Sequence, residues 1–216
     1  MSSFLGHSLA AVTVYVATEF WLVPPNDPRV KSWFKSDRLV WIGWLVIVAS
    51  IPDLDYVVKF WNSSNHQGLR ITHSILFSLI VPCLSILVLL LLKSDRIWRR
   101  SIQVTLAGLS HLVLDLSVGV TPLPLLFPLV KISFRLPFGI LPSAGRIDLQ
   151  NHYLYRNLGL EMGVLLPLFI ITCLFSLNKR ATVKNRFWLK FLGLSLAIAM
   201  SICASYFIQQ NLQLPR

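Results

Sequence analysis

Six apolar stretches, each close to the length that crosses a lipid bilayer, constrain the fold of this chain more than any other feature. They cover residues 7–23, 39–58, 71–92, 101–120, 158–177 and 187–208. A helix needs about 20 apolar residues to span the hydrocarbon layer, and only helices or closed barrels satisfy their backbone groups inside it. The sequence therefore predicts an all-α, polytopic membrane helix bundle with about six transmembrane helices and a long irregular loop between the fourth and fifth.

The composition agrees with this prediction. Hydrophobic residues make up 55% of the chain and charged residues 13%, whereas soluble domains have about 25% charged residues. All six stretches fit one bundle, so we expect a single integral membrane domain over residues 1–216. No Lys or Arg precedes the first stretch, which we therefore expect to be a retained helix and not a cleaved signal. Cys83, Cys173 and Cys203 lack metal-site or disulfide spacing.

The basic residues predict the orientation. The loops around residues 24–38, 93–100 and 178–190 lie on one side and carry thirteen Lys and Arg, against seven on the other side. Basic loops normally stay in the cytoplasm, so both termini are predicted to be extracytoplasmic. The net charge of +11 is explained by these short loops, and we expect no nucleic-acid partner.

All five histidines fall on the predicted extracytoplasmic side, together with several carboxylates. They are His7, His66, His73, His111 and His152. Random placement would scatter such residues over both faces of the membrane. Imidazole and carboxylate are the usual ligands of catalytic divalent metals, so the sequence predicts a metal site near this face.

Two of the candidate ligands lie on one predicted helix. His111 and Asp115 are four residues apart and therefore share a helical face. A charged Asp at membrane depth costs a few kcal/mol and is usually kept for function. An Asp–His ion pair, or a polar pair that joins two helices, is an equally good interpretation of these two residues alone.

A second motif ends the predicted helix 39–58. Pro52 should break or kink it, because proline lacks an N–H group. The following Asp53 and Asp55 can bridge two metal ions, or one can bind a metal while the other orients a histidine. The alternative is an ordinary aspartate cap at a helix end.

A third motif frames the start of the helix predicted from residue 71. His66 and His73 flank Gly68, which permits a tight turn, and Thr72 is placed to cap the helix. Arg70 is expected to pair with Asp53 or Asp55, or to hold an anionic substrate oxygen. A single histidine near a helix start is more often structural than a ligand.

Other polar residues carry weaker signals. Asp148 and His152 are expected in the long loop, Glu161 at the start of the fifth helix, and Glu19 in a polar packing contact. Residues 136–142 predict irregular backbone, either a flap over the site or a solvated loop.

The order of these motifs resembles the YdjM-like family, described as LexA-regulated, inner-membrane, metal-dependent hydrolases. The matching elements are Gly6-His7, Pro52-Asp53-Leu54-Asp55, His66-Gln67-Gly68, Thr72-His73-Ser74, Ser110-His111 with Asp115, Phe127-Pro128 and Phe134-Arg135-Leu136-Pro137. The resemblance covers about residues 4–142, and the last two helices carry no signature. The family commonly has Arg where this chain has Gln67, and its spacing to Thr-His-Ser is one residue shorter. Arg70 offers a guanidinium from a shifted position.

Together, the residues and the resemblance imply a metal-dependent hydrolase in a plasma (inner) membrane. The predicted metal ligands are His7, Asp53, Asp55, His66, His73, His111 and Asp115. Asp53 or Asp55 is the expected general base or bridging ligand, and Arg70 would neutralise developing negative charge. Zinc suits this ligand set best, with manganese or another divalent ion as alternatives. The site's depth favours a lipid or lipid-linked phosphoester, reached from the bilayer.

Two other functions compete with this hypothesis. Intramembrane His and Asp also serve cation or proton transporters, although no inverted repeat is visible in the sequence. A non-enzymatic membrane protein with a closed structural metal site would need the same ligand types. The sequence leaves the oligomeric state open.

Overall fold

The computed structural model describes residues 2–22, 36–56, 70–119, 122–136 and 152–178, with residues 191, 193–195 and 199–200 beyond them. Its elements are α1 (Phe4–Leu22), α2 (Ser36–Ser50), η2 (Ile51–Tyr56), η5 (Ile71–His73), α3 (Ile75–Leu91), α4 (Ile97–Val118) and α5 (His152–Asn178), of which η2 and η5 are short 3-10 helices. Within these residues, strand-like pairing is limited to one antiparallel bridge between Leu123 and Phe134. The predicted all-α fold is confirmed.

The expectation of six spans is met only in part. Two helices of the described chain, Ile97–Val118 and Leu154–Ser176, are long and apolar enough to cross a membrane by themselves. α3 is also apolar but has 17 residues, and α2 has 15 because it ends just before Pro52. Of the last predicted stretch, 187–208, six residues are described, and they are helical.

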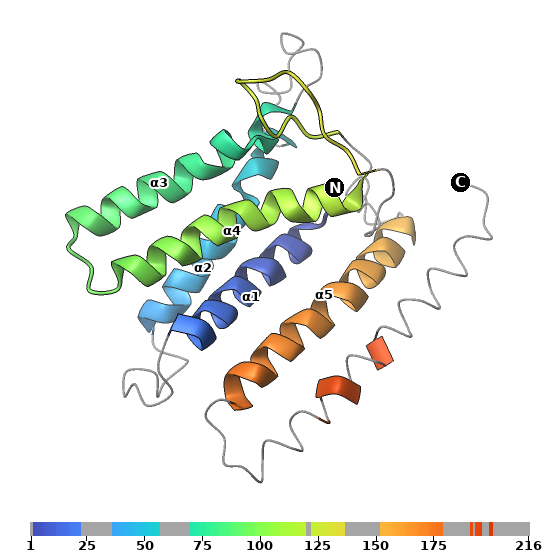
Figure 1. Ribbon diagram of the computed structural model, residues 1–216. Coiled ribbons are helices and arrows are strands. Elements are labelled where there is room, and N and C mark those ends of the chain that lie inside the picture. The colour runs from blue at the N-terminus through green and yellow to red at the C-terminus, as the bar shows by residue number, and fades with distance from the viewer. Residues whose placement is uncertain are drawn as a thin grey trace.

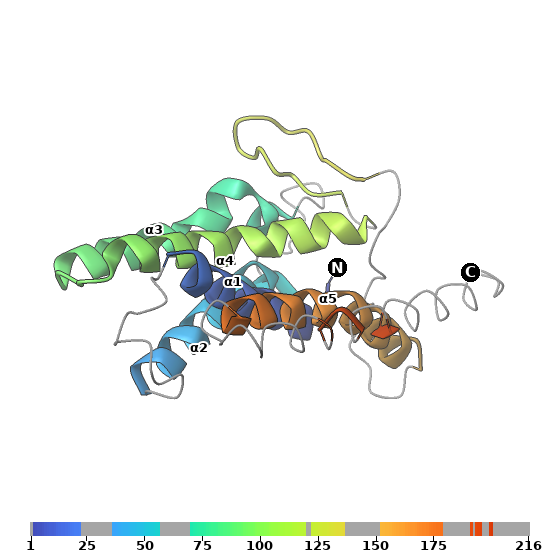
Figure 2. The same ribbon diagram turned by 60° about the horizontal axis from the view of Figure 1, so that its bottom comes forward.

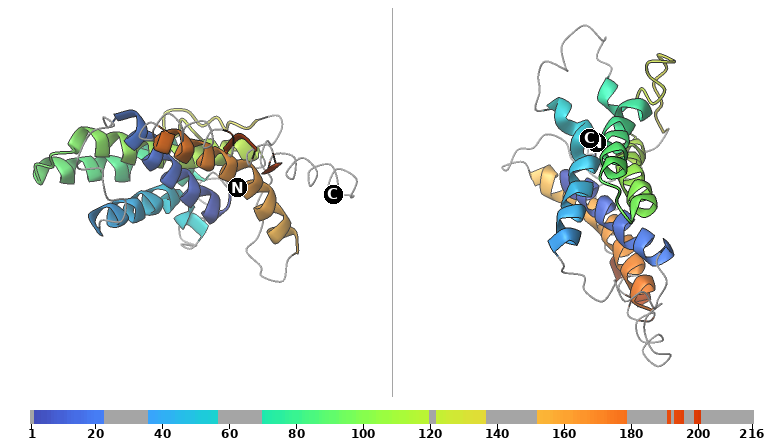
Figure 3. Two further views of the ribbon diagram at one scale, coloured as in Figure 1. Left: turned by 90° about the horizontal axis from the view of Figure 1, so that it is seen from below. Right: turned by 90° about the vertical axis from the view of Figure 1, so that its left-hand side faces the viewer.

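The helices form a bundle in which α1 and α4 are central. α4 packs against α1, α2 and α3, while α1 packs against α2, α4 and α5. Figure 1 shows the five α-helices side by side, with α3 and α5 at opposite edges. In Figure 2, α3 and α4 lie above α2 and α5, and the segment 122–136 stands over the end of α4. Figure 3 shows α5 at the edge farthest from α3.

An apolar core fills the middle of the bundle. It consists of Ala11, Tyr15 and Val16 of α1, Leu45, Val48 and Ala49 of α2, and Val104 and Ala107 of α4. Close helix contact depends on small residues. A Cβ on Gly108 would lie 2.8 Å from the carbonyl oxygen of Ser78 and 2.9 Å from Cγ of Pro82, so glycine lets α3 and α4 touch.

The outer faces of the edge helices are apolar as well. Leu84, Leu87 and Leu91 of α3 are 56%, 52% and 74% exposed, and Leu168 and Phe175 of α5 are 56% and 52% exposed. Large exposed apolar surfaces are unfavourable in water. Their presence on α3 and α5 fits helices that face lipid.

The helix ends agree with some expectations and correct others. α2 ends at Ser50 and Pro52 lies in η2, as predicted. Thr72 does not cap the following helix: Ser74 is the N-cap of α3, and its hydroxyl accepts a hydrogen bond from the Phe77 N–H at 3.2 Å. His152 opens α5, so it does not lie in the preceding loop, and Glu161 lies well inside that helix. The longer α5 follows from the mostly apolar, proline-free residues 152–166, which carry the helix further toward its N-terminus.

Candidate metal centre

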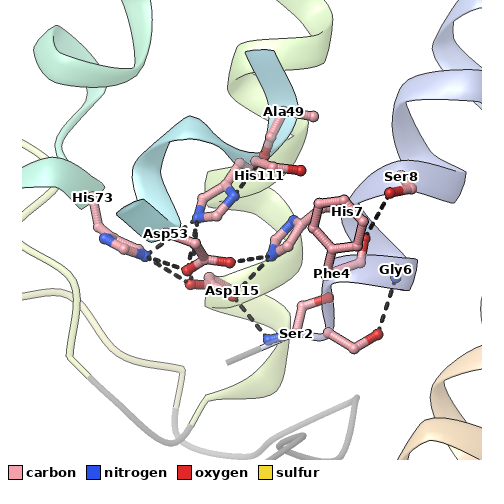
Figure 4. A network of polar contacts seen from close by, with 12 residues as sticks. Ser2, Phe4, Gly6, His7, Ser8, Ala49, Asp53, His73, His111 and Asp115 are labelled. Carbon is pink, nitrogen blue, oxygen red and sulfur yellow. Dashed lines mark hydrogen bonds and ion pairs between the residues drawn. The ribbon is translucent and has the colours of Figure 1, made fainter. Parts of the chain in front are cut away.

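Five ligand-type side chains from four elements meet at one end of the bundle. His7 comes from the start of α1, Asp53 from η2, His73 from η5, and His111 with Asp115 from the second half of α4. Figure 4 shows their side chains pointing toward one another. The side chains of all but Asp53 are completely buried, and that of Asp53 is 23% exposed.

Local sequence explains how each ligand reaches this place. α1 and α4 pack together, and the four-residue spacing on α4 keeps His111 and Asp115 on one face. α2 ends at Ser50, and the 3-10 turn that follows it contains Pro52 and Asp53. Ser74 starts α3 and so fixes His73 directly before the first turn.

The distances between the ligand atoms suit a shared metal ion. One atom each of His7, Asp53, His111 and Asp115 lies within 4.8 Å of the others. His73 Nε2 lies 3.1 Å from Asp115 Oδ2 and 3.5 Å from Asp53 Oδ1. His7 Nε2 lies 3.5 Å from Asp53 Oδ2 and 3.7 Å from Asp115 Oδ1. Ligand atoms bound at 2.0–2.1 Å to one tetrahedral ion are about 3.3 Å apart.

Buried polar atoms without hydrogen-bond partners also indicate a cation site. Nδ1 and Nε2 of His7, Oδ1 of Asp53 and Oδ2 of Asp115 are buried without a hydrogen-bond partner among the described residues. Leaving such atoms unsatisfied costs about 1–3 kcal/mol each, and more for charged groups. A cation between the carboxylates and imidazoles would satisfy the atoms that face one another.

The tautomer of His111 follows from its backbone contact. Its Nδ1 lies 2.8 Å from the carbonyl oxygen of Ala49. A carbonyl only accepts, so Nδ1 carries the proton and the neutral ring has a bare lone pair on Nε2. That atom lies 3.7 Å from Asp115 Oδ2 and 3.2 Å from Nε2 of His73. A histidine held through one nitrogen, with the other bare, is oriented as metal ligands usually are.

Charges within the cluster shift the pKa values of Asp53 and His73, which lie outside the α-helices. Burial raises the pKa of Asp53, but the imidazoles of His73, His111 and His7 outweigh burial and hold this pKa below its ordinary value. Burial lowers the pKa of His73, but the carboxylates of Asp115 and Asp53 outweigh it and hold this pKa above its ordinary value. The cluster thus favours an ionised Asp53 beside a positive charge.

A second group of residues supports the cluster from α5. Glu161 is 1% exposed. Its carboxylate accepts hydrogen bonds from the Ser3 N–H, at 3.0 and 3.1 Å, and from the Ser2 hydroxyl. The Ser2 N–H donates to Asp115 Oδ1 at 2.9 Å. A Cβ on Gly6 would lie 2.8 Å from Cδ of Glu161, which explains a glycine directly before His7.

The sequence gives little indication of this support. Glu161 carries only a weak signal, and Ser2 carries none. The available signal was a carboxylate inside an apolar stretch, which is usually paired or functional. Nothing in the sequence indicated that its partners would be at the other end of the chain.

The remaining predicted site residues are placed as follows. Arg70 lies beside the cluster, with Nη2 3.8 Å from Asp53 Oδ1. The side chain of Asp55 and the whole of His66 lie outside the described residues, as do Asp148 and residues 137–142. Glu19 makes a polar packing contact at the opposite end of the bundle, where it pairs with Arg99.

The comparisons with known proteins give a family. A family model described as YdjM inner membrane protein matches residues 1–203. The match covers most of the 216 residues, so the chain belongs to this family. It confirms the resemblance seen in the motifs and extends it into the last predicted helix. No curated protein and no solved structure matches the chain.

Proposed function

We propose that this member of the YdjM inner membrane protein family is a membrane-bound, metal-dependent hydrolase. The buried cluster of three imidazoles and two carboxylates carries the proposal, because several of its buried polar atoms have no hydrogen-bond partner among the described residues. Its substrate would be a phosphoester of a lipid or a lipid-linked molecule.

The ligand set would be His7, Asp53, His73, His111 and Asp115, with Asp55 and His66 added from the sequence motifs. Nitrogen and carboxylate oxygen ligands suit zinc, with manganese or another divalent ion as alternatives. A bound divalent ion would supply Lewis acidity, making water more acidic and polarising a phosphoryl oxygen.

The partly exposed residues would perform the chemistry. Asp53 is the most accessible carboxylate of the cluster, with 23% of its side chain exposed. Its low pKa keeps it ionised, so it can accept a proton from water or bind the metal. Arg70, with 15% exposure and Nη2 3.8 Å from Asp53 Oδ1, would hold an anionic oxygen of the phosphoryl group.

The proposed setting is near the extracytoplasmic surface of a six-span bundle. His7 lies within the first turns of α1 and Asp115 within the last turn of α4, so the cluster lies near one end of both helices. The exposed leucines of α3 and the apolar outer face of α5 support contact with lipid on both sides of the bundle. A lipid substrate could reach this depth from the bilayer.

Two observations favour the hydrolase over its competitors. A transporter needs a polar path through the bundle, whereas the core around Ala11, Leu45 and Val104 separates the cluster from the polar residues at the other end. A closed structural site leaves no position for water or substrate, whereas the partial exposure of Asp53 beside Arg70 gives solvent access to this side of the cluster. An open position is the mark of a catalytic site.

Metal analysis of the detergent-purified chain tests the proposal first. We expect stoichiometric divalent metal in the wild type and its loss in His73→Ala and Asp115→Asn. Asp95→Asn is a matched control, since Asp95 is an exposed carboxylate in the turn between α3 and α4. A wild type without metal, after incubation with zinc or manganese, refutes the metal site.

Hydrolysis assays then separate enzyme from structural protein. Phosphatidic acid and lipid pyrophosphates in mixed micelles are suitable probes, with release of phosphate as the readout. We expect metal-dependent release that Asp53→Asn abolishes and Asp95→Asn leaves unchanged. Full metal occupancy without hydrolysis of any lipid phosphoester would favour the structural role.

A further inference from the structure

A second polar cluster lies at the end of the bundle opposite the metal centre. It is built where α1 ends and where α2 and α4 begin, and Figure 1 shows these three helix ends close together. From Arg100 to Asp115 the axis of α4 rises about 22 Å, with the apolar core between. This cluster therefore does not belong to the proposed metal site.

The cluster lines a recess that is rich in arginine. Four arginines face it: Arg38, Arg96, Arg99 and Arg100. Arg38 is only 7% exposed, and the other three are half-buried. Positive charges held this close together, partly away from water, repel one another unless anions accompany them.

Among the described residues that line the recess, arginines outnumber carboxylates. Glu19 is engaged by Arg99, whose Nη1 lies 3.1 and 3.2 Å from its two oxygens, and by Gln103 Nε2 at 3.3 Å. Asp37 is the other acidic residue lining the recess, and it lies in the first turn of α2. The described lining residues thus carry two more positive than negative charges.

Two features prepare the recess for an anion. The first turn of α4 contains no acidic residue, so its N-terminal dipole adds positive potential. The guanidinium of Arg100 lies 4.9 Å from the ring centre of Trp41, and the indole of Trp41 donates to Gln103 Oε1 at 2.7 Å. These contacts hold Arg100 in place before any ligand arrives.

We propose that this recess binds a phosphate group. A guanidinium presents paired N–H groups that match phosphate oxygens, and arginines at a membrane surface attract anionic headgroups. An anionic phospholipid and free inorganic phosphate offer the same chemistry. The recess lies on the side with more Lys and Arg, where phospholipid headgroups would meet it.

Native mass spectrometry of the detergent-purified chain tests this binding. Dioleoylphosphatidylglycerol is titrated in one arm, zwitterionic dioleoylphosphatidylcholine in a second, and inorganic phosphate in a third. We expect saturable binding of one phosphatidylglycerol or one phosphate, and weaker binding of phosphatidylcholine. Phosphatidylglycerol alone identifies a lipid site, and phosphate alone identifies a site for the free anion. Saturable binding of neither refutes the proposal.

Paired variants locate the site. Arg96→Gln with Arg100→Gln should weaken binding by about tenfold or more, since each arginine near an anionic surface contributes a several-fold gain. Lys131→Gln with Arg135→Gln removes the same charge from exposed positions on the segment 122–136 and should leave the affinity within about twofold. Unchanged affinity in the first pair, or an equal loss in both pairs, refutes the recess as the site.

A single substitution keeps the binding test valid even where the double variant misfolds. The side chain of Arg96 makes no capping hydrogen bond to α4, so Arg96→Gln should keep the helix intact. Its circular dichroism and gel-filtration profile should match the wild type while its affinity falls several-fold. An unchanged affinity in this folded variant also counts against the proposal.

Discussion

The Nδ1–H of His111 donates to the backbone carbonyl of Ala49, 2.8 Å away, and this contact joins the face of α4 that carries the candidate metal ligands to the end of α2. α2 ends at Ser50, so the Ala49 carbonyl is one of the last four that lack a partner within a helix. One hydrogen bond thus satisfies a carbonyl at the end of α2 and orients the imidazole with Nε2 toward Asp115.

His111→Ala removes both the hydrogen-bond donor to Ala49 and a candidate metal ligand. The Ala49 carbonyl loses its partner and a buried cavity appears, so we expect a loss of about 2–4 kcal/mol in metal-free stability. Zinc should no longer stabilise the variant. Thermal unfolding in detergent, with and without zinc, measures both effects. Ser110→Ala is the control, because the Ser110 hydroxyl bonds only to Ala107 of its own helix among the described contacts. Wild-type stabilisation by zinc in His111→Ala would exclude this histidine as a ligand.

Gly6→Ala should disturb the packing of α1 against α5. Its Cβ would overlap Glu161, and overpacking of this kind costs about 1–3 kcal/mol. Gly43→Ala on α2 is the matched control, since no atom lies within 4 Å of its Cβ. There, alanine should be neutral or stabilise the helix by up to about 1 kcal/mol. Equal unfolding temperatures for the two variants would contradict the proposed contact.

Glu161→Ala should weaken metal binding without removing a ligand. The carboxylate holds Ser2 and Ser3, and the Ser2 N–H in turn donates to Asp115. Loss of such outer partners typically lowers metal affinity about 10–100-fold. Chelator competition measures this loss. Glu161→Gln keeps one acceptor oxygen, so its zinc affinity should lie between those of the alanine variant and the wild type. A zinc affinity unaffected by Glu161→Ala would show that this support is dispensable.

Zinc affinity should rise with pH. A metal needs the neutral imidazole of His73, whose pKa lies above its ordinary value of 6.5, so below that raised pKa binding must displace a proton. The affinity should fall about tenfold per pH unit in that range for one proton and level off above it. Asp53 adds no dependence near neutrality, because its lowered pKa keeps it ionised. Chelator competition between pH 5.5 and 8.5 provides the measurement, and a flat profile would exclude His73 as a ligand.

Local patterns were sufficient to predict several parts of the site. The apolar stretches indicated helices, the spacing of His111 and Asp115 placed them on one face, and Pro52 marked the end of α2. These predictions depend only on residues within a few positions of one another. The predicted cap at Thr72 was wrong because Ser74, two residues later, has the better geometry to accept from the first turn of α3.

What the sequence by itself determined was therefore the helical class, the family motifs and the residue types available for a site. The tertiary structure decided which of them meet. His7 and Asp115 are more than a hundred positions apart, and only the packing and rotation of α1 against α4 bring Nε2 and Oδ1 to 3.7 Å. The same holds for Glu161, whose partners Ser2 and Ser3 lie more than 150 positions away, near the N-terminus. Such distances depend on how whole helices cross, a property that residues within one helix do not encode.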